Sequence, residues 1–590
     1  MPERAPADAG AARELTRRSI LTGMVLGAIL TPCNVYSGLK IGWSFNMSIV
    51  AALLSYGFWN LAAAPLGARH WGLLENNINQ TTASSAASII SGGLVAPIPA
   101  LALLTGQTLP LHWLVAWVGV VSLLGVSVAV SMRRQLLVVE QLTFPAGVAT
   151  AETVKEIYGR GAEAAARVRV LLAALLVSGL VKALESFTAW LSSWALPLRL
   201  SGGGMMAGRS ISGGQLGFAL DPSLLLVGFG AIIGLRAGLS LLVGAILAWG
   251  VLAPMLLASG AVELGADAGD FWYPALVEWL LWPGVALMVS ASLTAFALAI
   301  ARRRPVAVET AAAATDEPIS RRAFWIGFGA TLLLAVVAQT SLFGIDWITA
   351  VLAVLLAYGL AVVAARVVGE TGIPPIGALG KVSQLTFGVL APANLTANVM
   401  TANVAGGAAG QCADLLNDLK TGHLVGATPR LQITAQLFGI LTGSVVGSLA
   451  YLALIPDPQT MLITAEWPAP AVVTWKAVAE VLSGGLSAVP AGAIPAMGLA
   501  AVLGVVIACA RALGPGLIGR LAPSAPAAGL AFVIPASNSI SLFLGAVAAA
   551  IAAVVAPRWS ARFVIALAAG LVAGESLVGV LVAFLRLGGL

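Results

Sequence analysis

"LHWLVAWVGVVSLLGVSVAVS", residues 111–131, decides the fold class of this chain. About 20 predominantly apolar residues suffice for an α-helix to cross the hydrocarbon core of a bilayer. A second such run, "WITAVLAVLLAYGLAVVAA", covers residues 347–365, and similar runs recur along nearly the whole chain. Of the 590 residues, 59% are hydrophobic and 9% charged, whereas soluble domains carry roughly 25% charged residues. The runs also lack the alternation of barrel strands. The sequence therefore predicts an all-α polytopic membrane protein.

Clusters of arginine mark the predicted topology. They are Arg17-Arg18, Arg133-Arg134, Arg302-Arg303-Arg304 and Arg321-Arg322. About four predicted crossings separate the first cluster from the second, and about four more separate the second from the third. All clusters then lie on one side of the membrane, which the positive-inside rule makes the cytoplasmic side. We expect a multi-pass protein of the cell (inner or plasma) membrane, with residues 1–19 as a cytoplasmic N-terminal tail.

The charged segment 302–322, "RRRPVAVETAAAATDEPISRR", is the best candidate for a cytoplasmic linker. It divides the chain into transmembrane halves at 20–301 and 323–590. The pattern Asn-x-x-Thr-Ala-x-x-Ala occurs at 79–86 and again at 398–405, which suggests that the halves are pseudo-repeats. Broken or re-entrant segments are expected within them, and counting these as crossings or half-crossings gives roughly 14–16 spans.

Composition argues against several other classes of protein. The net charge of +6 comes mostly from arginines in connecting loops and indicates topology, so no nucleic-acid partner is expected. Three cysteines are widely spaced and three histidines lie in distant segments, which predicts neither a protein-built metal site nor a cofactor. The stretch "GALGKVS" (377–383) lacks the residues of a phosphate-binding loop.

Two polar segments of the N-terminal half are candidate cavity linings. In residues 31–48, Pro32 and three further residues, Asn34, Gly38 and Gly42, would break a helix, and irregular backbone survives in a membrane only within protein or around a water-filled cavity. The predicted substrate-binding residues here are Asn34, Tyr36 and Lys40, and in "ENNINQTTASSAAS" (75–88) they are Asn76, Asn79 and Gln80. The alternatives are a Pro-kinked helix end with a snorkelling Lys40, and tight packing of small residues.

Carboxylates at membrane depth are candidates for carrying a proton, because an unpaired charge there is costly. Glu370 stands at the end of an apolar run, and Glu575 lies inside the last predicted span. Glu152 follows an apolar stretch, 142–151, which is either re-entrant or a cytoplasmic amphipathic loop. A buried carboxylate has a raised pKa and can titrate near neutral pH.

The segment 384–430 holds the remaining candidates. Amide residues suited to hydrogen-bonding a substrate are Gln384, Asn394, Asn398, Asn403 and Gln411. The charged run "QCADLLNDLKTGHLVGATPR" (411–430) follows them, with Asp414, Asp418, Lys420 and Arg430. So much charge would be expensive in hydrocarbon, so we expect a network or gate at the cytoplasmic membrane edge, with a plain solvated loop as the alternative. If this run is helical, its two aspartates share one face.

Four stretches together resemble one known family. "NVYSGLKIGWSFNMS", "LTFPAGVATAE", "GETGIPPIG" and "DLLNDLKTGHLVGATPR" resemble the oligopeptide transporter superfamily, closest to its yellow-stripe-like branch. The resemblance runs from about residue 20 to 586. It implies an all-helical, two-halved fold of about sixteen spans. It also implies a proton-coupled importer whose substrates are small peptides or metal complexes of chelators such as nicotianamine.

The working hypothesis is a proton-coupled secondary symporter with its cavity between the two halves, in contact with lipid, substrate and protons. Asn79, Gln80, Asn398 and Asn403 would hydrogen-bond the substrate, and Lys40 would offset its negative charge. A facilitator or channel for a small polar solute is the alternative, and an integral-membrane enzyme is disfavoured. The substrate, the coupling ion and the oligomeric state, including a homodimer, stay open.

Overall fold

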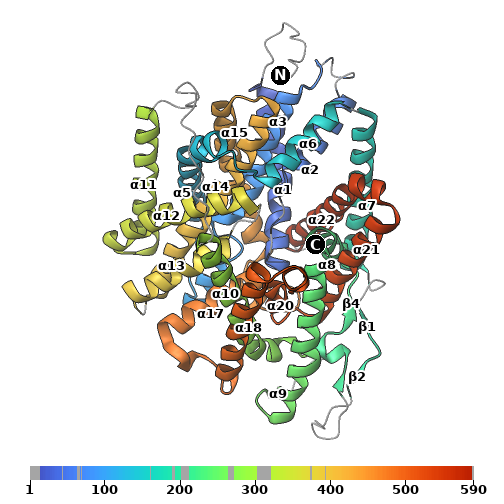
Figure 1. The fold of residues 1–590 in the computed structure, drawn as a ribbon, viewed down its shortest axis with the longest axis vertical. Coiled ribbons are helices and arrows are strands. Elements are labelled where there is room, and N and C mark those ends of the chain that lie inside the picture. The colour runs from blue at the N-terminus through green and yellow to red at the C-terminus, as the bar shows by residue number, and fades with distance from the viewer. Residues whose placement is uncertain are drawn as a thin grey trace.

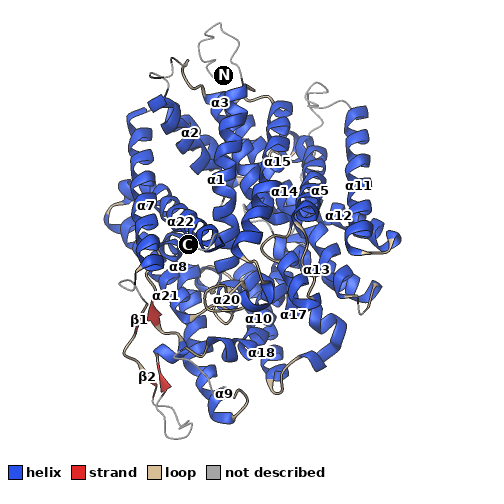
Figure 2. Ribbon diagram, turned by 180° about the vertical axis from the view of Figure 1, so that it is seen from behind, coloured by secondary structure: helices blue, strands red, loops and turns tan. Residues whose placement is uncertain are grey.

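The computed structural model describes residues 14–587 except 43, 45, 63–64, 66, 68, 160, 189–192, 201–210, 264–270, 302–320, 372–374 and 393. The described chain is almost entirely helical, as Figure 2 shows, and this confirms the predicted fold class. Its strands form two small antiparallel ribbons between α7 and α8, in which β1 (Trp194–Ala195) pairs with β4 (Ala219–Leu220) and β2 (Arg199–Leu200) with β3 (Ile211–Ser212). Most of the expected linker 302–322, and the tail up to residue 13, lie outside the described residues.

The helices before the expected linker include several interrupted ones. Their bounds are α1 (Arg17–Ile41), α2 (Ser48–Ala62), α3 (Leu73–Ala87), η1 (Ser88–Gly92), α4 (Pro97–Thr105), α5 (Leu111–Arg133), η2 (Arg134–Val139), α6 (Pro145–Gly159), α7 (Gly161–Phe187), η3 (Gly214–Leu216), α8 (Leu224–Ala245), η4 (Ile246–Leu252), α9 (Ala253–Ser259) and α10 (Tyr273–Ala301).

The helices after it begin with α11, and Figure 1 shows that α11 and α1 start at the same end of the molecule. Their bounds are α11 (Arg321–Phe343), α12 (Trp347–Thr371), α13 (Ile376–Leu390), α14 (Leu395–Val425), α15 (Pro429–Leu454), α16 (Pro458–Met461), α17 (Pro470–Gly484), η5 (Gly485–Ala488), α18 (Ala493–Leu513), α19 (Leu517–Leu521), α20 (Ala525–Leu530), α21 (Ala536–Val555) and α22 (Pro557–Leu587).

Twelve helical stretches in the described chain are long and apolar enough to cross a membrane. Two shorter apolar helices, at Ser48–Leu61 and Ile376–Leu390, add to them. The 31-residue α14 is long enough but is not among the twelve, because polar side chains occupy much of it. With these three as crossings or half-crossings, the number falls within the predicted 14–16.

Glycines let the helices around α3 approach closely. A Cβ at Gly23 or Gly27 of α1 would stand 2.6 Å from side-chain atoms of α3, and a Cβ at Gly439 of α15 would stand 2.3 Å from the carbonyl oxygen of Thr82. Small residues at such contacts are typical of membrane helices, where packing rather than the hydrophobic effect drives association. They place α3 directly between α1 and α15.

The predicted helix break at residues 32–38 is wrong. The helix α1 runs unbroken through Pro32, and its end comes at Gly42, whose φ of +73° suits a glycine. Proline is tolerated within membrane helices when neighbouring groups satisfy the freed backbone. At Pro535 the helical pattern is interrupted, since this proline lies between α20 and α21.

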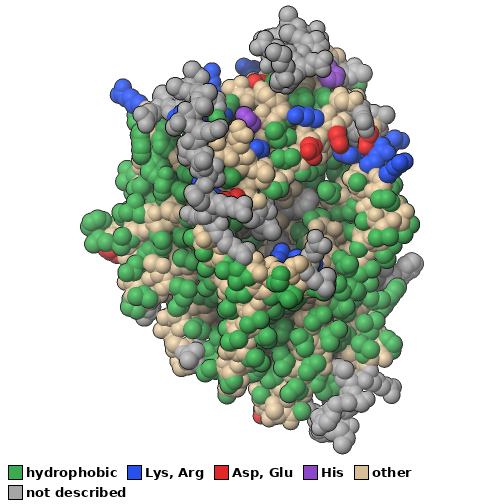
Figure 3. Space-filling model, in the orientation of Figure 1, with side chains coloured by type: hydrophobic (Ala, Val, Ile, Leu, Met, Phe, Trp, Pro, Cys, Tyr) green, Lys and Arg blue, Asp and Glu red, His purple; other side chains and the backbone are tan. Residues whose placement is uncertain are grey.

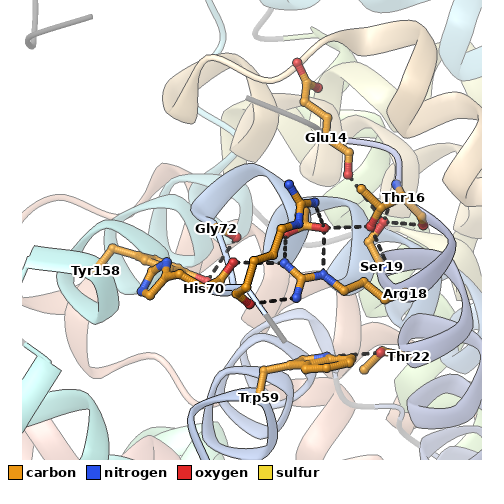
Figure 4. Close-up of polar contacts among 11 residues, drawn as sticks. Glu14, Thr16, Arg18, Ser19, Thr22, Trp59, His70, Gly72 and Tyr158 are labelled. Carbon is orange, nitrogen blue, oxygen red and sulfur yellow. Dashed lines mark hydrogen bonds and ion pairs between the residues drawn. The ribbon is translucent and has the colours of Figure 1, made fainter. Parts of the chain in front are cut away.

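A network of ion pairs joins the starts of α1 and α3 (Figure 4). The carboxylate of Glu75 is only 3% exposed and accepts hydrogen bonds from Arg18, Arg69 and the Thr16 hydroxyl. Arg18 also donates to the backbone carbonyls of Arg69 and His70, and the Thr16 hydroxyl accepts from the backbone N–H of Ser19. Glu75 is thus neutralised by neighbours and acts as a structural anchor.

Charge is unevenly spread over the surface. In Figure 3 the Lys and Arg side chains gather mainly toward the end at which α1 begins, above a lower part covered mostly by hydrophobic side chains. This pattern fits a protein whose apolar surface is embedded in lipid.

Candidate functional site

Polar side chains of α2, α3, α14 and α15, and of η1 directly after α3, meet in the interior, and we call this group the polar cluster. It consists of Ser48, Asn76, Asn79, Gln80, Ser84, Ser85, Ser88, Gln411, Asp414, Asp418, Gln432 and Gln436. All are buried except the half-buried Ser88. Polar groups at this depth must bind one another, a ligand or water.

The two aspartates of the cluster have different surroundings. Asp414 accepts hydrogen bonds from the hydroxyls of Ser84 (3.1 Å) and Ser88 (2.8 Å) and from the amide of Gln436 (3.4 Å). Asp418 accepts one from the hydroxyl of Ser48, at 3.3 Å. Neither has an ion pair among the residues that the structure describes.

Several acceptor oxygens of the cluster have no partner in the described chain. They are Oδ1 of Asn79, Oδ2 of Asp418 and Oε1 of Gln80, Gln411, Gln432 and Gln436. An unpaired polar atom away from water costs free energy comparable to a lost hydrogen bond. Apart from Nδ2 of the neighbouring Asn77, which is an unpaired donor, these unpaired atoms are acceptors, and acceptors suit a cation or a proton.

A cavity of about 190 Å³ lies between α10 of the first predicted half and α13, α17 and α20 of the second. Its wall includes Lys381 and Trp475. The Lys381 ammonium is 3% exposed, donates to Oε1 of Gln384 (3.0 Å) and lies 4.3 Å from the Trp475 ring centre. Gln384 in turn binds Asn398, so two predicted substrate residues stand behind this cavity. We call it the lysine pocket.

A second cavity of about 190 Å³ lies between α1, α7, α15 and α22. Tyr36 and Trp467 line it, with ring centres 5.3 Å apart. The Lys40 ammonium lies 5.9 and 5.8 Å from the centres of these two rings. Lys182, Glu466 and Arg586 bring charge to this wall.

The predicted substrate residues thus do not converge on one cavity. Asn76, Asn79, Gln80 and Gln411 belong to the polar cluster; Gln384 and Asn398 back the lysine pocket; Tyr36 lines the second cavity, with Lys40 near its ring. Three more bind other parts of the chain. Asn34 donates to the carbonyl of Ala87, Asn394 is exposed and caps α14, and Asn403 accepts from the Trp117 indole at 2.7 Å. Polar residues that look alike in the sequence therefore lie in different parts of the structure.

Burial of the three predicted proton carriers is confirmed for Glu575 alone. Its carboxylate is 3% exposed and accepts hydrogen bonds from Ser223 and from the backbone N–H of Leu225, both at 2.8 Å, so that it caps the start of α8. Glu370 and Glu152 are exposed, at the end of α12 and on α6. The expectation of a buried carboxylate is wrong for these two residues, and their role in coupling stays a prediction.

The charged run 411–430 is not a solvated loop. The helix α14 continues to Val425, and Asp414, Asp418 and Lys420 are buried. Lys420 donates to the carbonyl of Leu142, 2.8 Å away, and Arg430 is exposed on α15. Among the described residues, neither forms an ion pair with Asp414 or Asp418, so the predicted ionic network is not found there. The polar faces of α3 and α15 shelter the two aspartates and make their burial tolerable. A role as a gate stays a prediction.

The sequence analysis missed Lys381, Trp475, Ser48, Ser84, Ser88, Gln432 and Gln436 as site residues. A signal existed for two pairs: Ser84 and Ser88, and Gln432 and Gln436, each lie four residues apart, which places them on one helix face. Lys381 and Trp475 are 94 positions apart, and only the packing of α13 on α17 brings them together.

The sequence was compared with those of known proteins. The profile of the OPT oligopeptide transporter family matches residues 14–586. This chain belongs to that family. The chain is therefore a membrane transporter and not an enzyme.

Individual relatives align over most of this family member. A Saccharomyces cerevisiae protein that bears an oligopeptide-transporter name is 26% identical over 80% of this chain and 82% of its own length. The metal-nicotianamine transporter YSL2 of Arabidopsis thaliana is 24% identical over 96% of this chain and 92% of its own. The iron-phytosiderophore transporter yellow stripe 1 of Zea mays is 24% identical over 96% and 89%. The resemblance seen in the four sequence stretches is confirmed.

Proposed function

We propose that this chain is a proton-coupled symporter that imports small peptides or metal complexes of amino-acid-like chelators across the cell membrane. Membership of the family supports transport as such, and the names of the relatives favour these two substrate classes. Metal complexes of amino-acid-like chelators and short peptides both present carboxylate and amine groups, so one kind of pocket could serve both.

The observation that carries the substrate class is the Lys381 ammonium. It is buried at the wall of a cavity between the two predicted halves, and it has no acidic partner among the described residues. A buried cation without a counter-ion favours an anionic ligand, and a substrate carboxylate supplies that charge. The cavity of about 190 Å³ is smaller than the roughly 300–1,000 Å³ of ligand pockets, so it would hold the carboxylate end of a substrate.

The direction of transport rests on topology. The first turns of α1 and α11 contain arginine clusters. Both helices start at the same end of the molecule, toward which surface Lys and Arg gather. By the positive-inside rule this end faces the cytoplasm. The other end would then admit substrate from outside.

The test is uptake into proteoliposomes of two probes, the tripeptide Ala-Ala-Ala and radioactive zinc loaded on nicotianamine. We expect one or both to accumulate above the external concentration when protons flow inward, and this accumulation to stop when an ionophore collapses the gradient. Uptake that only reaches equilibrium under every gradient would identify the facilitator alternative instead. Uptake of neither probe would reject the substrate classes.

A further inference from the structure

The aspartates of the polar cluster stand one helical turn apart on α14. Asp414 is 8% exposed and binds Ser84 of α3, whereas Asp418 is 1% exposed and binds Ser48 of α2. Residues four apart on a helix lie about 6 Å from each other, so two negative charges here would repel strongly in a poorly polarisable interior.

Charged residues of the helices packed around α14 do not relieve this repulsion. They are Glu75 on α3, Arg133 on α5, Glu152, Lys155 and Glu156 on α6, Arg322 on α11, Arg366 and Glu370 on α12, Lys381 on α13, Arg430 on α15, and Lys476 and Glu480 on α17. On α14 itself, Lys420 binds the carbonyl of Leu142. In the described part of the chain, none of these forms an ion pair with either aspartate.

Hydrogen bonds distinguish the two carboxyl groups. Three donors point at Asp414, and hydrogen bonds to a carboxylate favour its charged form. Asp418 has the Ser48 hydroxyl at 3.3 Å on one oxygen and no partner on the other. When two neighbouring acids have such different surroundings, one stays ionised and the other holds the proton.

The serine hydroxyls of this network have one proton fewer than their hydrogen-bond contacts require. The Ser48 oxygen lies within hydrogen-bond distance of both Ser84 (2.9 Å) and Asp418 (3.3 Å), but a serine hydroxyl has a single proton to give. The Ser84 proton already serves Asp414. One of the two contacts of Ser48 therefore has no donor unless Asp418 supplies one.

We propose that Asp418 is the group that takes up and releases the coupled proton, with Asp414 ionised beside it. The assignment rests on the proton-coupled transport proposed above. Uptake forms an O–H bond on a carboxyl oxygen of Asp418, and release returns the proton to water. The protonated group is a donor next to the Ser48 oxygen, which accepts it.

The helix α14 connects this group to the lysine pocket. Asn398, which binds Gln384 behind that pocket, lies 20 residues before Asp418, or about 30 Å along the same helix. Proton uptake by Asp418 changes the hydrogen bonds by which α14 contacts α2 and α3, so a resulting shift of this one helix would reach the pocket. That gives proton binding a physical route to the substrate.

The experiment compares wild type, Asp418→Asn, Asp414→Asn and Ser48→Ala in proteoliposomes, with whichever of the two probes the wild type takes up. Accumulation is driven by an inward proton gradient, and exchange of labelled for unlabelled probe is measured without a gradient over a range of pH. We expect Asp418→Asn, which mimics the neutral acid, to exchange at a pH-independent rate but to lose accumulation. Its exchange also shows that it has folded.

The other two variants both move the pH profile down. Ser48→Ala removes the hydroxyl oxygen that accepts the Asp418 proton, so the protonated form loses a hydrogen bond and the profile moves down by about one pH unit. Asp414→Asn removes the like charge, so coupled accumulation persists and the profile moves down by about as much. An unchanged profile in Ser48→Ala overturns the assignment even if Asp418→Asn does not fold.

The outcomes separate this inference from the function on which it rests. Proton-driven accumulation in wild type and equally in Asp418→Asn overturns the assignment of Asp418 and leaves symport intact. Wild-type accumulation that ignores the proton gradient, or that follows a sodium gradient instead, rejects proton coupling itself and the proton on Asp418 with it.

Discussion

The Lys381 ammonium lies 4.3 Å from the centre of the Trp475 ring, at the wall of a cavity between helices of the two predicted halves. An indole face attracts a cation without neutralising it. The lysine is therefore held in place by α17 while its charge remains available to a ligand. This one contact explains how a strongly apolar protein can keep a cation ready at a binding surface.

Replacing Lys381 by Gln should weaken binding of a carboxylate substrate by about 10- to 100-fold, since a charge-assisted hydrogen bond is lost. Equilibrium binding of the transported probe to purified protein measures the change. Lys476→Gln is the matched control, because Lys476 follows Trp475 on α17 and pairs with Glu480 at a half-exposed position. Equal affinity in both variants would remove Lys381 from the substrate site.

Loss of the Glu75 charge should destabilise the fold. Glu75→Gln leaves the part-buried Arg18 and the exposed Arg69 without their shared buried carboxylate, and hydrogen bonds to charged groups contribute about 1.5–3 kcal/mol. A fall in the thermal unfolding temperature in detergent reports the effect. Glu185→Gln, which breaks the more exposed pair with Lys182, should cost under about 1 kcal/mol. If the two variants melt alike, the anchor between α1 and α3 is weaker than its geometry indicates.

Neutralising the exposed carboxylates should leave coupling intact. Glu370→Gln and Glu152→Gln change carboxylates that are exposed. An exposed carboxylate can stay charged at little cost in free energy, so its exposure does not favour protonation. Gradient-driven accumulation by each variant should match wild type within about twofold. Loss of accumulation with retained exchange in either variant would restore that residue as a proton carrier.

A methyl group at Gly439 should loosen the packing of α15 on α3. Its Cβ would stand 2.3 Å from the Thr82 carbonyl oxygen and 2.5 Å from the Ser85 Cβ, and overpacking of this kind costs about 1–3 kcal/mol. Gly498→Ala on α18 is the control, because no atom lies within 4 Å of its Cβ and alanine favours a helix. Thermal stability in detergent distinguishes them, and a Gly439→Ala protein as stable as the control would show that α15 can move away freely.

Much of the architecture could be predicted from the order of residues. Long apolar runs fixed where helices such as α5 and α12 lie, because each must satisfy its own backbone hydrogen bonds in lipid. Local chemistry also placed the break at Pro535 and the end of α12 before Pro375. It failed at Pro32, where the neighbours of α1 compensate for the missing hydrogen bond and the helix continues.

The candidate sites were only partly visible in the sequence. Amide-rich stretches correctly indicated buried polar surfaces around Asn79 and Asn398. They could not show that the two residues belong to different environments, nor that Asp414 and Asp418 are buried, because burial depends on which distant helices cover a face. Without α3 and α15, the run 411–430 has the composition of a loop at the membrane edge.

By itself, the sequence determined that this protein is a bundle of membrane helices and to which family it belongs, since hydrophobic length and short motifs are local properties. The tertiary structure alone decided which polar groups meet. Ser48 reaches Asp418, and Lys381 reaches Trp475, across separations of 370 and 94 positions. Hydrogen bonds and charge interactions act over a few ångströms of space, whatever the distance along the chain.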